Sequence, residues 1–502
     1  MNDTMNDTMN NDNLMRNSFR HTTWLVAIAI LLVAGDLAYS FYQHSKYPME
    51  GDMEESVLPR DYLLPLYQDP FGVKMLANGE PHAAPNRFFS HYLLYKTYRT
   101  VPFGLQKAVE PLTSLYLTNA LCKTLMQIAL LLLLCTLACG GFRVKEPRFY
   151  LAMLLFTPLF QTNGATRSFG MIDPSLTYSF FYALPLIFLI CCLLPFIYEE
   201  FFHRPFLPNP ILRAVWFLFF LILTCFSGGV NTAIAIVAIL TLAIRYIFTY
   251  CSDKTLEKKS LGLFFKSIPK HYWLYLLPLG LLSLYALWLG TFNTMWSGEI
   301  PTLAERYRLL PKGFLSMFKN TAFDIFFAIS VFNFVIIRLN FPQKGHAAIQ
   351  FFLWMNVFAL LYMALLPFGG YRSYRPGIIR YDVIIAVNFL YILFLVYSTL
   401  FLLENLSKQK VRISYIIGCL VFMAYFTAID KPLRWGSGNE KEIAAIRQIQ
   451  AATETPVVLT EPATVVSWMP AYCVEESKNA SEMLYVWRIT DTVKPFYCLN
   501  AE

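Results

Sequence analysis

The sequence predicts an all-α polytopic membrane protein with about eleven membrane-spanning helices. Of its 502 residues, 56% are hydrophobic and only 15% are charged, a composition too apolar for a soluble domain of this length. Long apolar runs recur along the chain, and most reach the length of about 20 residues with which a helix crosses a bilayer. Lysine and arginine concentrate in alternate loops between these runs, as the positive-inside rule requires.

The predicted spans cover residues 22–42, 114–139, 149–162, 176–198, 212–226, 230–250, 272–292, 321–340, 349–368, 383–403 and 413–429. The third and the fifth are short for a full crossing, which predicts that they are tilted, partly re-entrant or extended by neighbouring residues. The first run follows Arg16, Arg20 and His21 without a small-residue cleavage site, which predicts a retained signal anchor. The polar repeat in residues 1–21 is predicted to be a disordered cytoplasmic segment.

The basic loops set the predicted orientation. Under this count, segments 142–148, 253–270 and 407–412 fall on the same side as the amino terminus, so this side is predicted to be cytoplasmic. The carboxyl end then lies outside. The predicted organisation is a membrane domain in residues 22–429, with a long first outer loop in 43–113, and a small extracytoplasmic α/β domain in 430–502.

The first outer loop contains an aromatic-rich stretch, residues 85–104. Phe88, Tyr92 and Tyr95 share one helical face there, which predicts either a helix lying in the membrane interface or a helix packed against the bundle. In the carboxyl-terminal domain, residues 439–452 are predicted to form an amphipathic helix with a capping box, and Glu442 is its third helical residue.

Four short strands are predicted to follow this helix, in the segments PVVLT, ATVVSW, MLYVW and KPFYCL. Cys473 and Cys498 are both in this domain, and an extracytoplasmic location would permit a disulfide between them.

Several function classes are excluded by what the sequence lacks. The net charge of +8 is scattered over the loops with no basic arm or stripe, which argues against nucleic acid as a partner. The ten cysteines include no CxxC pair and no Cys/His cluster, so no zinc or iron–sulfur site is predicted. No Walker motif or GxGxxG follows a strand, which argues against a nucleotide substrate.

Acidic side chains cluster in MEGDMEES, residues 49–56. Glu50 and Asp52 flank Gly51 in a turn-forming context, where a carboxylate is able to act as a general base or to bind a divalent cation. The alternative is a solvated loop whose charges keep it out of the bilayer. Asp36 lies inside the first apolar run, and an intramembrane carboxylate is costly enough to be a functional candidate.

Arginines interleave with tyrosines in GGYRSYRPGIIRYD, residues 369–382, which is predicted to lie outside. Arginine forks bind phosphate oxygens in pairs, so this pattern predicts a phosphate or pyrophosphate site. The alternatives are anchoring to lipid headgroups or ion pairs with the acidic first loop. Two further outer segments, 299–313 and 163–175, supply more arginine. The candidate substrate-binding residues are Arg372, Arg375, Arg380, Tyr371, Tyr374, Arg306, Arg308 and Arg167.

This organisation resembles that of the membrane-embedded GT-C glycosyltransferases. NRFFSHYLLY (86–95) and YRSYRPGIIRYD (371–382) are also similar to segments of uncharacterised multi-span proteins of Bacteroidota that are grouped with GT-C-like enzymes. The resemblance covers nearly the whole chain in architecture, whereas the shared motif is only an acidic residue early in the first outer loop. It implies Asp52 as first and Glu50 as second candidate for the catalytic base, with Asp36 as a third if the first span is shorter.

The resemblance implies a hexosyl or pentosyl transfer at the outer face of a bacterial cytoplasmic membrane. The donor would be a polyprenyl-phosphate-linked sugar, and the acceptor a glycan, a lipid or a protein. A divalent cation, Mg²⁺ or Mn²⁺, is compatible with this chemistry but not required by it. The alternatives are a transporter or flippase for a lipid-linked glycan, a polysaccharide polymerase or ligase, and an inactive scaffold.

Overall fold

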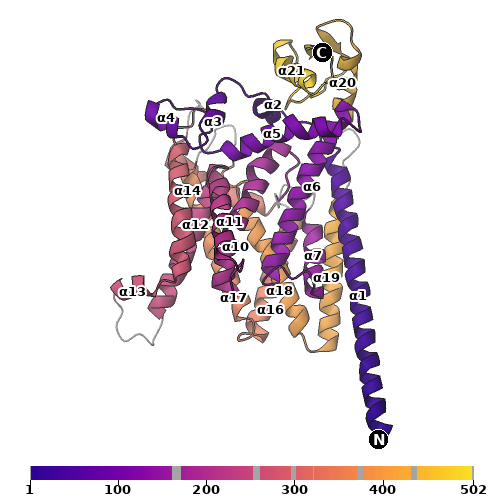
Figure 1. Cartoon of the computed structure of the whole chain (residues 1–502), viewed down its shortest axis with the longest axis vertical. Helices are drawn as coiled ribbons and strands as arrows, with labels where there is room; N and C mark the ends of the chain where they lie inside the picture. The colour runs from indigo at the N-terminus through magenta and orange to yellow at the C-terminus, as the bar shows by residue number, and fades with distance from the viewer. Residues whose placement is uncertain are drawn as a thin grey trace.

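The structure, a computed structural model, describes residues 2–160, 171–252, 261–295, 301–319, 321–369, 377–430 and 438–499. Side chains are described from residue 23 onward, except that of Leu261. Helices dominate, and they stand side by side in one bundle (Figure 1). Helix α6 (Pro111–Ala138) is central to this bundle because it contacts α1, α5, α7, α10 and α18.

Nine helices among the described residues are long and apolar enough to cross a membrane, which confirms a polytopic helical protein. The first five cover Thr23–His44 of α1, α6, Leu176–Phe201 with α9 (Leu176–Tyr178), η2 (Ser179–Ala183) and α10 (Leu184–Phe201), α12 (Gly229–Ser252), and Tyr272–Gly290 with η3 (Tyr272–Leu276) and α14 (Leu277–Gly290). The other four cover α16 (Thr321–Asn340), His346–Phe368 with α17 (His346–Leu365) and η4 (Leu366–Phe368), α18 (Ile385–Asn405) and α19 (Gln409–Ile429). The two remaining predicted spans are shorter helices, α7 (Pro147–Phe156) with η1 (Thr157–Leu159), and α11 (Pro210–Cys225).

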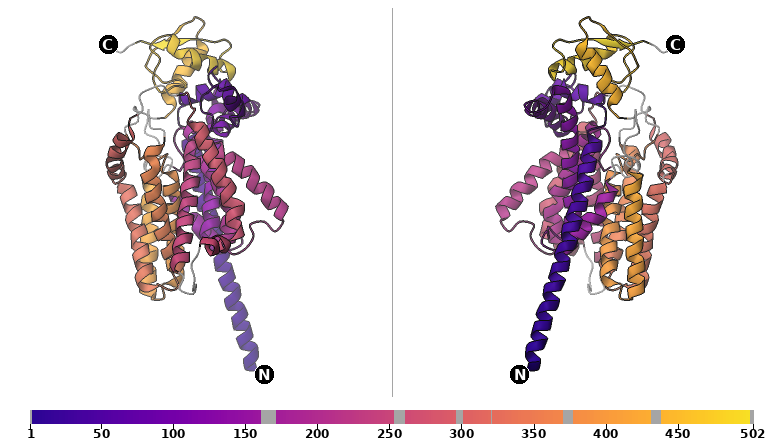
Figure 2. Two further views of the ribbon diagram at one scale, coloured as in Figure 1. Left: turned by 90° about the vertical axis from the view of Figure 1, so that its left-hand side faces the viewer. Right: turned by 90° about the vertical axis from the view of Figure 1, so that its right-hand side faces the viewer.

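Helix α1 differs from its prediction. It runs unbroken from Asn2 to His44, so residues 2–21 are helical although their polar repeat predicts disorder. Neither proline nor glycine occurs before Gly35, and an existing helix extends at the cost of ordering only one residue for each added hydrogen bond. The amino-terminal part of α1 projects beyond the bundle (Figures 1 and 2).

One end of the bundle is covered by two pieces of chain that are far apart in sequence; we call it the capped end. The first piece is the segment between α1 and α6, with α2 (Asp52–Val57), α3 (Leu64–Gln68), α4 (Val73–Asn78) and α5 (Phe88–Leu105). The second is the C-terminal unit, residues 438–499, which lies above α5 (Figure 1). The opposite end carries the α6–α7 and α18–α19 connections and α13 (Leu261–Ser267) (Figure 1).

Helix α5 is the helix predicted in residues 85–104, and it lies across the capped end (Figure 1). Its buried face consists of Ser90, His91, Leu94, Tyr98 and Pro102, which recur every three or four residues. The aromatic stripe lies on another face and is half-buried, with the Tyr95 ring 5.4 Å from that of Tyr67. Helix α5 therefore packs against the bundle while Tyr92 and Tyr95 pack against Tyr67 of α3.

The C-terminal unit is a small α/β arrangement. It contains α20 (Glu440–Ala451), β1 (Val457–Leu459), η5 (Glu475–Ser477), α21 (Lys478–Val486) and β2 (Phe496–Cys498), and its two strands pair in parallel. Only two of the four predicted strands form. The segment MLYVW instead belongs mainly to α21, because Ala480, Met483, Leu484 and Trp487 recur at helical spacing and are all buried. Cys473 and Cys498 are both free thiols.

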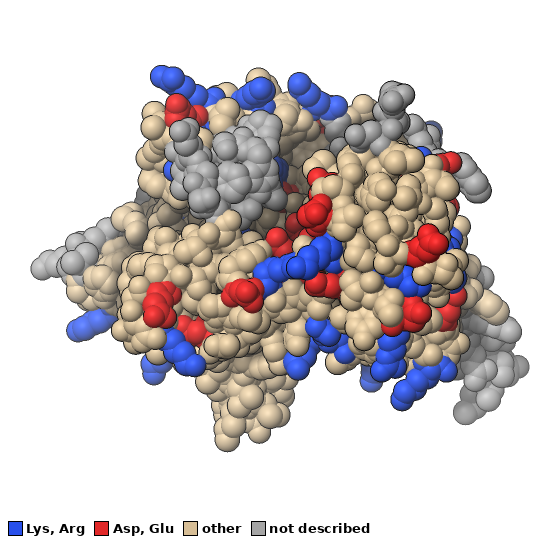
Figure 3. Space-filling model, turned by 90° about the horizontal axis from the view of Figure 1, so that it is seen from above, with Lys and Arg blue, Asp and Glu red and all other residues tan. Residues whose placement is uncertain are grey.

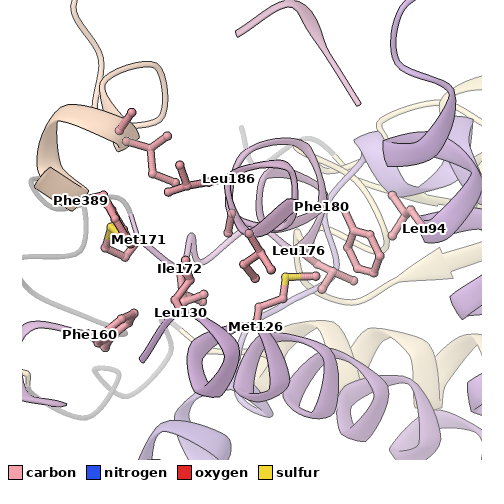
Figure 4. Close-up of a cluster of buried hydrophobic side chains, with 14 of the residues drawn as sticks. Leu94, Met126, Leu130, Phe160, Met171, Ile172, Leu176, Phe180, Leu186 and Phe389 are labelled. Atoms are coloured by element: carbon pink, nitrogen blue, oxygen red, sulfur yellow. The ribbon is translucent and has the colours of Figure 1, made fainter. Parts of the chain in front are cut away.

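A buried apolar cluster fixes the segment that enters the membrane helix at Leu176. Met171 and Ile172 insert between α6, α10 and α18, where they lie near Leu130, Leu176 and Phe389 (Figure 4). Met171 is 2% and Ile172 3% exposed, so the backbone that follows them is held at a definite position. The polar residues that follow, starting with Asp173, are thereby placed at the capped end.

Candidate functional site

Glu50 lies at the start of the membrane helix Leu176–Phe201. Its carboxylate accepts hydrogen bonds from the backbone nitrogen of Thr177 at 2.6 Å, from the Thr177 hydroxyl and from the backbone nitrogen of Leu176 at 3.4 Å. The first N–H groups of a helix have no partner within the helix, and the helix dipole favours negative charge there. Glu50 therefore ties the first loop to this helix, and both of its carboxylate oxygens are engaged.

Lys123 of α6 approaches the same turn from the other side. Its ammonium group donates to the backbone carbonyl of Pro174 and lies 4.8 Å from the centre of the Tyr47 ring. Glu50 and Asp173 are its negatively charged neighbours. Lys123 is fully buried, and a buried ammonium group is stable only when such partners replace its water.

Asp173 is a buried acidic residue of this region whose pKa lies close to neutrality. Its Oδ1 accepts from the backbone nitrogen of Ser175 at 2.8 Å, and the residue is only 6% exposed. Burial raises the pKa of Asp173 to about 6, against the opposing influence of the Ser175 amide and the Lys123 ammonium. A carboxylate with a pKa near neutrality is suited to take up a proton and release it again.

Arg380 provides a positive charge in the segment that precedes α18. Its guanidinium forms a two-bond pair with Asp382, with Nε 3.0 Å from Oδ1 and Nη2 bonded to Oδ2. The Tyr381 hydroxyl interacts with the Asp173 carboxylate, which joins this segment to the turn before α9. The Asp382 side chain is buried, whereas that of Arg380 remains 21% exposed and is still able to contact a ligand.

Asp36 has no direct contact with Asp173 among the interactions of the described residues, but the two share electrostatic neighbours. Asp36 is half-buried on α1, and its charged neighbour is Asp430, the residue that follows α19. The hydroxyl of Tyr47 is an electrostatic neighbour of both Asp430 and Asp173. We call Asp173, Lys123, Arg380, Tyr381 and Asp382 the mouth cluster, and Asp36 lies beside it rather than within it.

The acidic segment 49–56 serves mainly to join parts of the molecule. The indole nitrogen of Trp468 donates to Asp52 Oδ1 at 2.9 Å, and the amide of Asn479 donates to Glu54 at 3.1 Å. A Cβ at Gly51 would lie 2.9 Å from Trp468, so only glycine permits this close approach. Asp52 and Glu54 are therefore contacts of the C-terminal unit.

Replacing Trp468 by phenylalanine removes the hydrogen bond to Asp52 and keeps most of the aromatic contact. We expect the contact between segment 49–56 and the C-terminal unit to lose about 1 kcal/mol. Amide hydrogen exchange in segment 49–56 should then be roughly fivefold faster. Tyr472→Phe, at an exposed ring of the same unit, is the control. Unchanged exchange in Trp468→Phe would contradict the role given to Asp52.

Glu442 is a buried carboxylate at the junction of three segments. It accepts hydrogen bonds from the backbone nitrogens of Met49 at 2.9 Å and Val466 at 3.0 Å, and from the Tyr116 hydroxyl at 2.7 Å. The predicted capping box is therefore absent. The Asn439 amide donates to the Ser45 carbonyl instead of capping α20. The Glu442 carboxylate is held by the three donors from Met49, Val466 and Tyr116 instead of closing a capping box.

The other predicted substrate-binding residues fall into two groups. Arg306, on α15 (Leu303–Met317), donates to the backbone carbonyls of Pro301, Pro367 and Gly369, so it binds α15 to the end of η4 (Leu366–Phe368). Arg308 on the same helix is exposed. Arg167, Tyr371, Arg372, Tyr374 and Arg375 lie outside the described residues.

The predicted candidates are thus brought together only in part. Arg380 belongs to the mouth cluster and Glu50 lies at its base, whereas Asp52 faces the C-terminal unit. Sequence reasoning missed Lys123, although a lysine inside an apolar run is a recognisable signal of a buried charge. Figure 3, which looks onto the capped end, shows acidic and basic side chains interspersed rather than segregated.

The chemistry available at the mouth cluster is proton transfer next to an anion site. Asp173 is a suitable general base, and Arg380 is a suitable partner for a phosphate oxygen. In the described part of the chain, no three His, Cys, Asp or Glu side chains are grouped closely enough to hold a metal ion.

Comparisons with known proteins add no relative from which a function could be transferred. No protein-family model matches the chain, and neither a curated protein nor a solved structure gives a significant match.

Proposed function

We propose that the protein is a membrane glycosyltransferase that takes a sugar from a polyprenyl-phosphate donor. The observation that carries this proposal is the mouth cluster, in which Asp173, with a pKa near 6, and the Arg380–Asp382 pair meet at one end of an apolar bundle. A donor with a lipid tail and a phosphate needs an apolar bundle for the tail and a cation at its mouth for the phosphate. In this proposal the capped end faces the outside of a bacterial cytoplasmic membrane.

The proposed reaction is a displacement at the anomeric carbon. Asp173 takes the proton of the acceptor hydroxyl, whose oxygen forms a bond to that carbon. The bond between the anomeric carbon and the phosphate oxygen breaks, and polyprenyl phosphate leaves with the electron pair. Arg380 stabilises the charge that develops on the leaving phosphate. Of the acidic candidates, Asp173 fits the base best because Glu50 is occupied by Thr177 and Leu176.

The test is a transfer assay in proteoliposomes with radiolabelled polyprenyl-phosphate sugars, supplied one at a time with glycan, lipid or protein acceptors. The proposal expects label on an acceptor and free polyprenyl phosphate as the second product. Label that moves between leaflets without transfer would overturn the proposal in favour of a flippase.

Arg380→Lys keeps the positive charge but loses the two-bond geometry of the guanidinium fork. We expect the KM for the donor to rise about tenfold, which corresponds to the loss of one charge-assisted hydrogen bond, with a smaller change in kcat. Arg143→Lys, in the exposed Arg143–Glu146 pair at the opposite end of the bundle, is the control and should leave KM unchanged. An unchanged donor KM in Arg380→Lys would remove the proposed phosphate contact.

A further inference from the structure

A polar cleft lies at the capped end, between α5 and the C-terminal unit. It has a volume of about 690 Å³, and its walls include Arg99 of α5 and Gln450, Arg488, Thr490 and Asp491 of the C-terminal unit. None of these residues belongs to the mouth cluster. The cleft is large enough to take a phosphate together with the group that carries it.

Arg99 is held in a position that leaves much of its guanidinium available. Its Nε donates to the backbone carbonyl of Val57 at 3.1 Å, and its guanidinium carbon lies 5.8 Å from the centre of the Tyr95 ring. Among the described residues, no carboxylate forms an ion pair with Arg99. Fixing one edge of the guanidinium reduces the entropy that a ligand must overcome when it binds the other edge.

Arg488 faces the same cleft from the C-terminal unit. It follows the end of α21 with a backbone φ of +61°, a left-handed conformation that glycine usually provides at this position of a helix end. Its guanidinium carbon lies 5.2 Å from the centre of the Phe103 ring of α5, and its side chain is exposed. No ion pair to Arg488 occurs within the described ranges.

The remaining polar groups of the cleft leave it positively charged. Asp491 is the one carboxylate in its walls, and Lys494 already pairs with it at 2.9 Å. Thr490 is only 6% exposed, and its hydroxyl is buried. This hydroxyl has no hydrogen-bond partner in the described part of the chain. A buried hydroxyl without a partner is unfavourable, and a ligand that supplied an acceptor would remove that penalty.

We propose that this cleft binds a phosphate group through Arg99, Arg488 and Thr490. Two guanidinium groups and a hydroxyl supply several donors from different directions, which suits a tetrahedral oxyanion. The phosphate of a lipid headgroup and that of a water-soluble ligand share this chemistry. The site is separate from the mouth cluster, so this inference does not rest on the proposed glycosyltransferase activity.

The test is binding to the full chain in lipid nanodiscs, in two arms at constant ionic strength. In the first arm, inorganic pyrophosphate is titrated into phosphatidylcholine nanodiscs and its heat of binding is measured. In the second, phosphatidylglycerol replaces part of the phosphatidylcholine, and protein-bound phosphatidylglycerol is counted by native mass spectrometry. Saturable binding in the first arm identifies a soluble phosphate ligand, whereas specific retention in the second identifies a lipid headgroup.

Arg488→Gln, Arg99→Gln and Thr490→Val are the variants, and Lys478→Gln, which removes an exposed charge of the same unit, is the control. We expect each arginine variant to weaken binding at least tenfold and the control to leave it unchanged. Thr490→Val should weaken binding without lowering the melting temperature, because it removes a hydroxyl that has no partner in the free protein. Absence of binding in both arms, or equal loss in Lys478→Gln, would overturn the proposal.

Discussion

Asp173→Asn should reduce sugar transfer by about 10²–10⁴-fold while leaving donor binding nearly unchanged. Asparagine retains an oxygen that accepts the hydrogen bond from the Ser175 amide, so the turn before α9 is preserved. It is unable to take the proton of the acceptor hydroxyl. The measurement is the rate of transfer at saturating donor, together with the dissociation constant of the donor for the same purified variant.

The pH dependence gives an independent check on Asp173. A base must be deprotonated to act, and the pKa of Asp173 is raised to about 6. Therefore kcat/KM should fall about tenfold per pH unit below pH 6 and reach a plateau above it. Asp61→Asn, at an exposed acid of the first loop, is the control and should keep both the rate and the profile. Substantial turnover in Asp173→Asn would assign the base to another residue.

Glu442→Ala should destabilise the attachment of the C-terminal unit by about 3 kcal/mol. The substitution leaves three buried donors without their acceptor, namely the amides of Met49 and Val466 and the hydroxyl of Tyr116. Part of that loss is offset because alanine removes the free-energy cost of burying a carboxylate away from water. Limited proteolysis of residues 438–499 in nanodiscs, compared with thermal unfolding of the whole chain, measures the effect.

The pH dependence of this attachment has a definite sign. Burial raises the pKa of Glu442 from 4.5 to about 7, so the folded state binds the proton more tightly than the unfolded state does. Stability should therefore be highest below about pH 4.5, decline as the pH rises towards 7, and be constant above that. Glu442→Ala should lose this dependence. Glu440→Ala, at an exposed acid of the same helix, should retain it, and a loss in both would point to another group.

Much of the fold follows from the sequence because apolar length alone determines which helices are able to cross a bilayer. The helical stripe of residues 85–104 likewise predicted α5. The segment MLYVW was misjudged because aromatic and β-branched residues favour strands locally, whereas burial of Met483 and Trp487 at helical spacing decides the outcome. Such tertiary packing is not encoded in any short window.

The site was less predictable than the fold. The acidic segment 49–56 was conspicuous in the sequence, yet the pairing of Asp52 with Trp468 depends on a contact across 416 positions. Asp173 lies in a short turn, and the groups that surround it, Lys123, Tyr381 and Asp382, are distant from it in the sequence. Lys123 was predictable from the local sequence, because it is a charged residue inside the apolar run 114–139.

The contacts of Glu442 have a consequence for how the protein is made. Met49 and Glu442 are 393 positions apart, so the first loop must wait until the C-terminal unit has been synthesised before its partner exists. Every membrane helix is inserted before the capped end is able to close. During synthesis the first loop and the turn before α9 are therefore accessible to chaperones and proteases. Synthesis of residues 438–499 therefore acts as a checkpoint for assembly of the capped end.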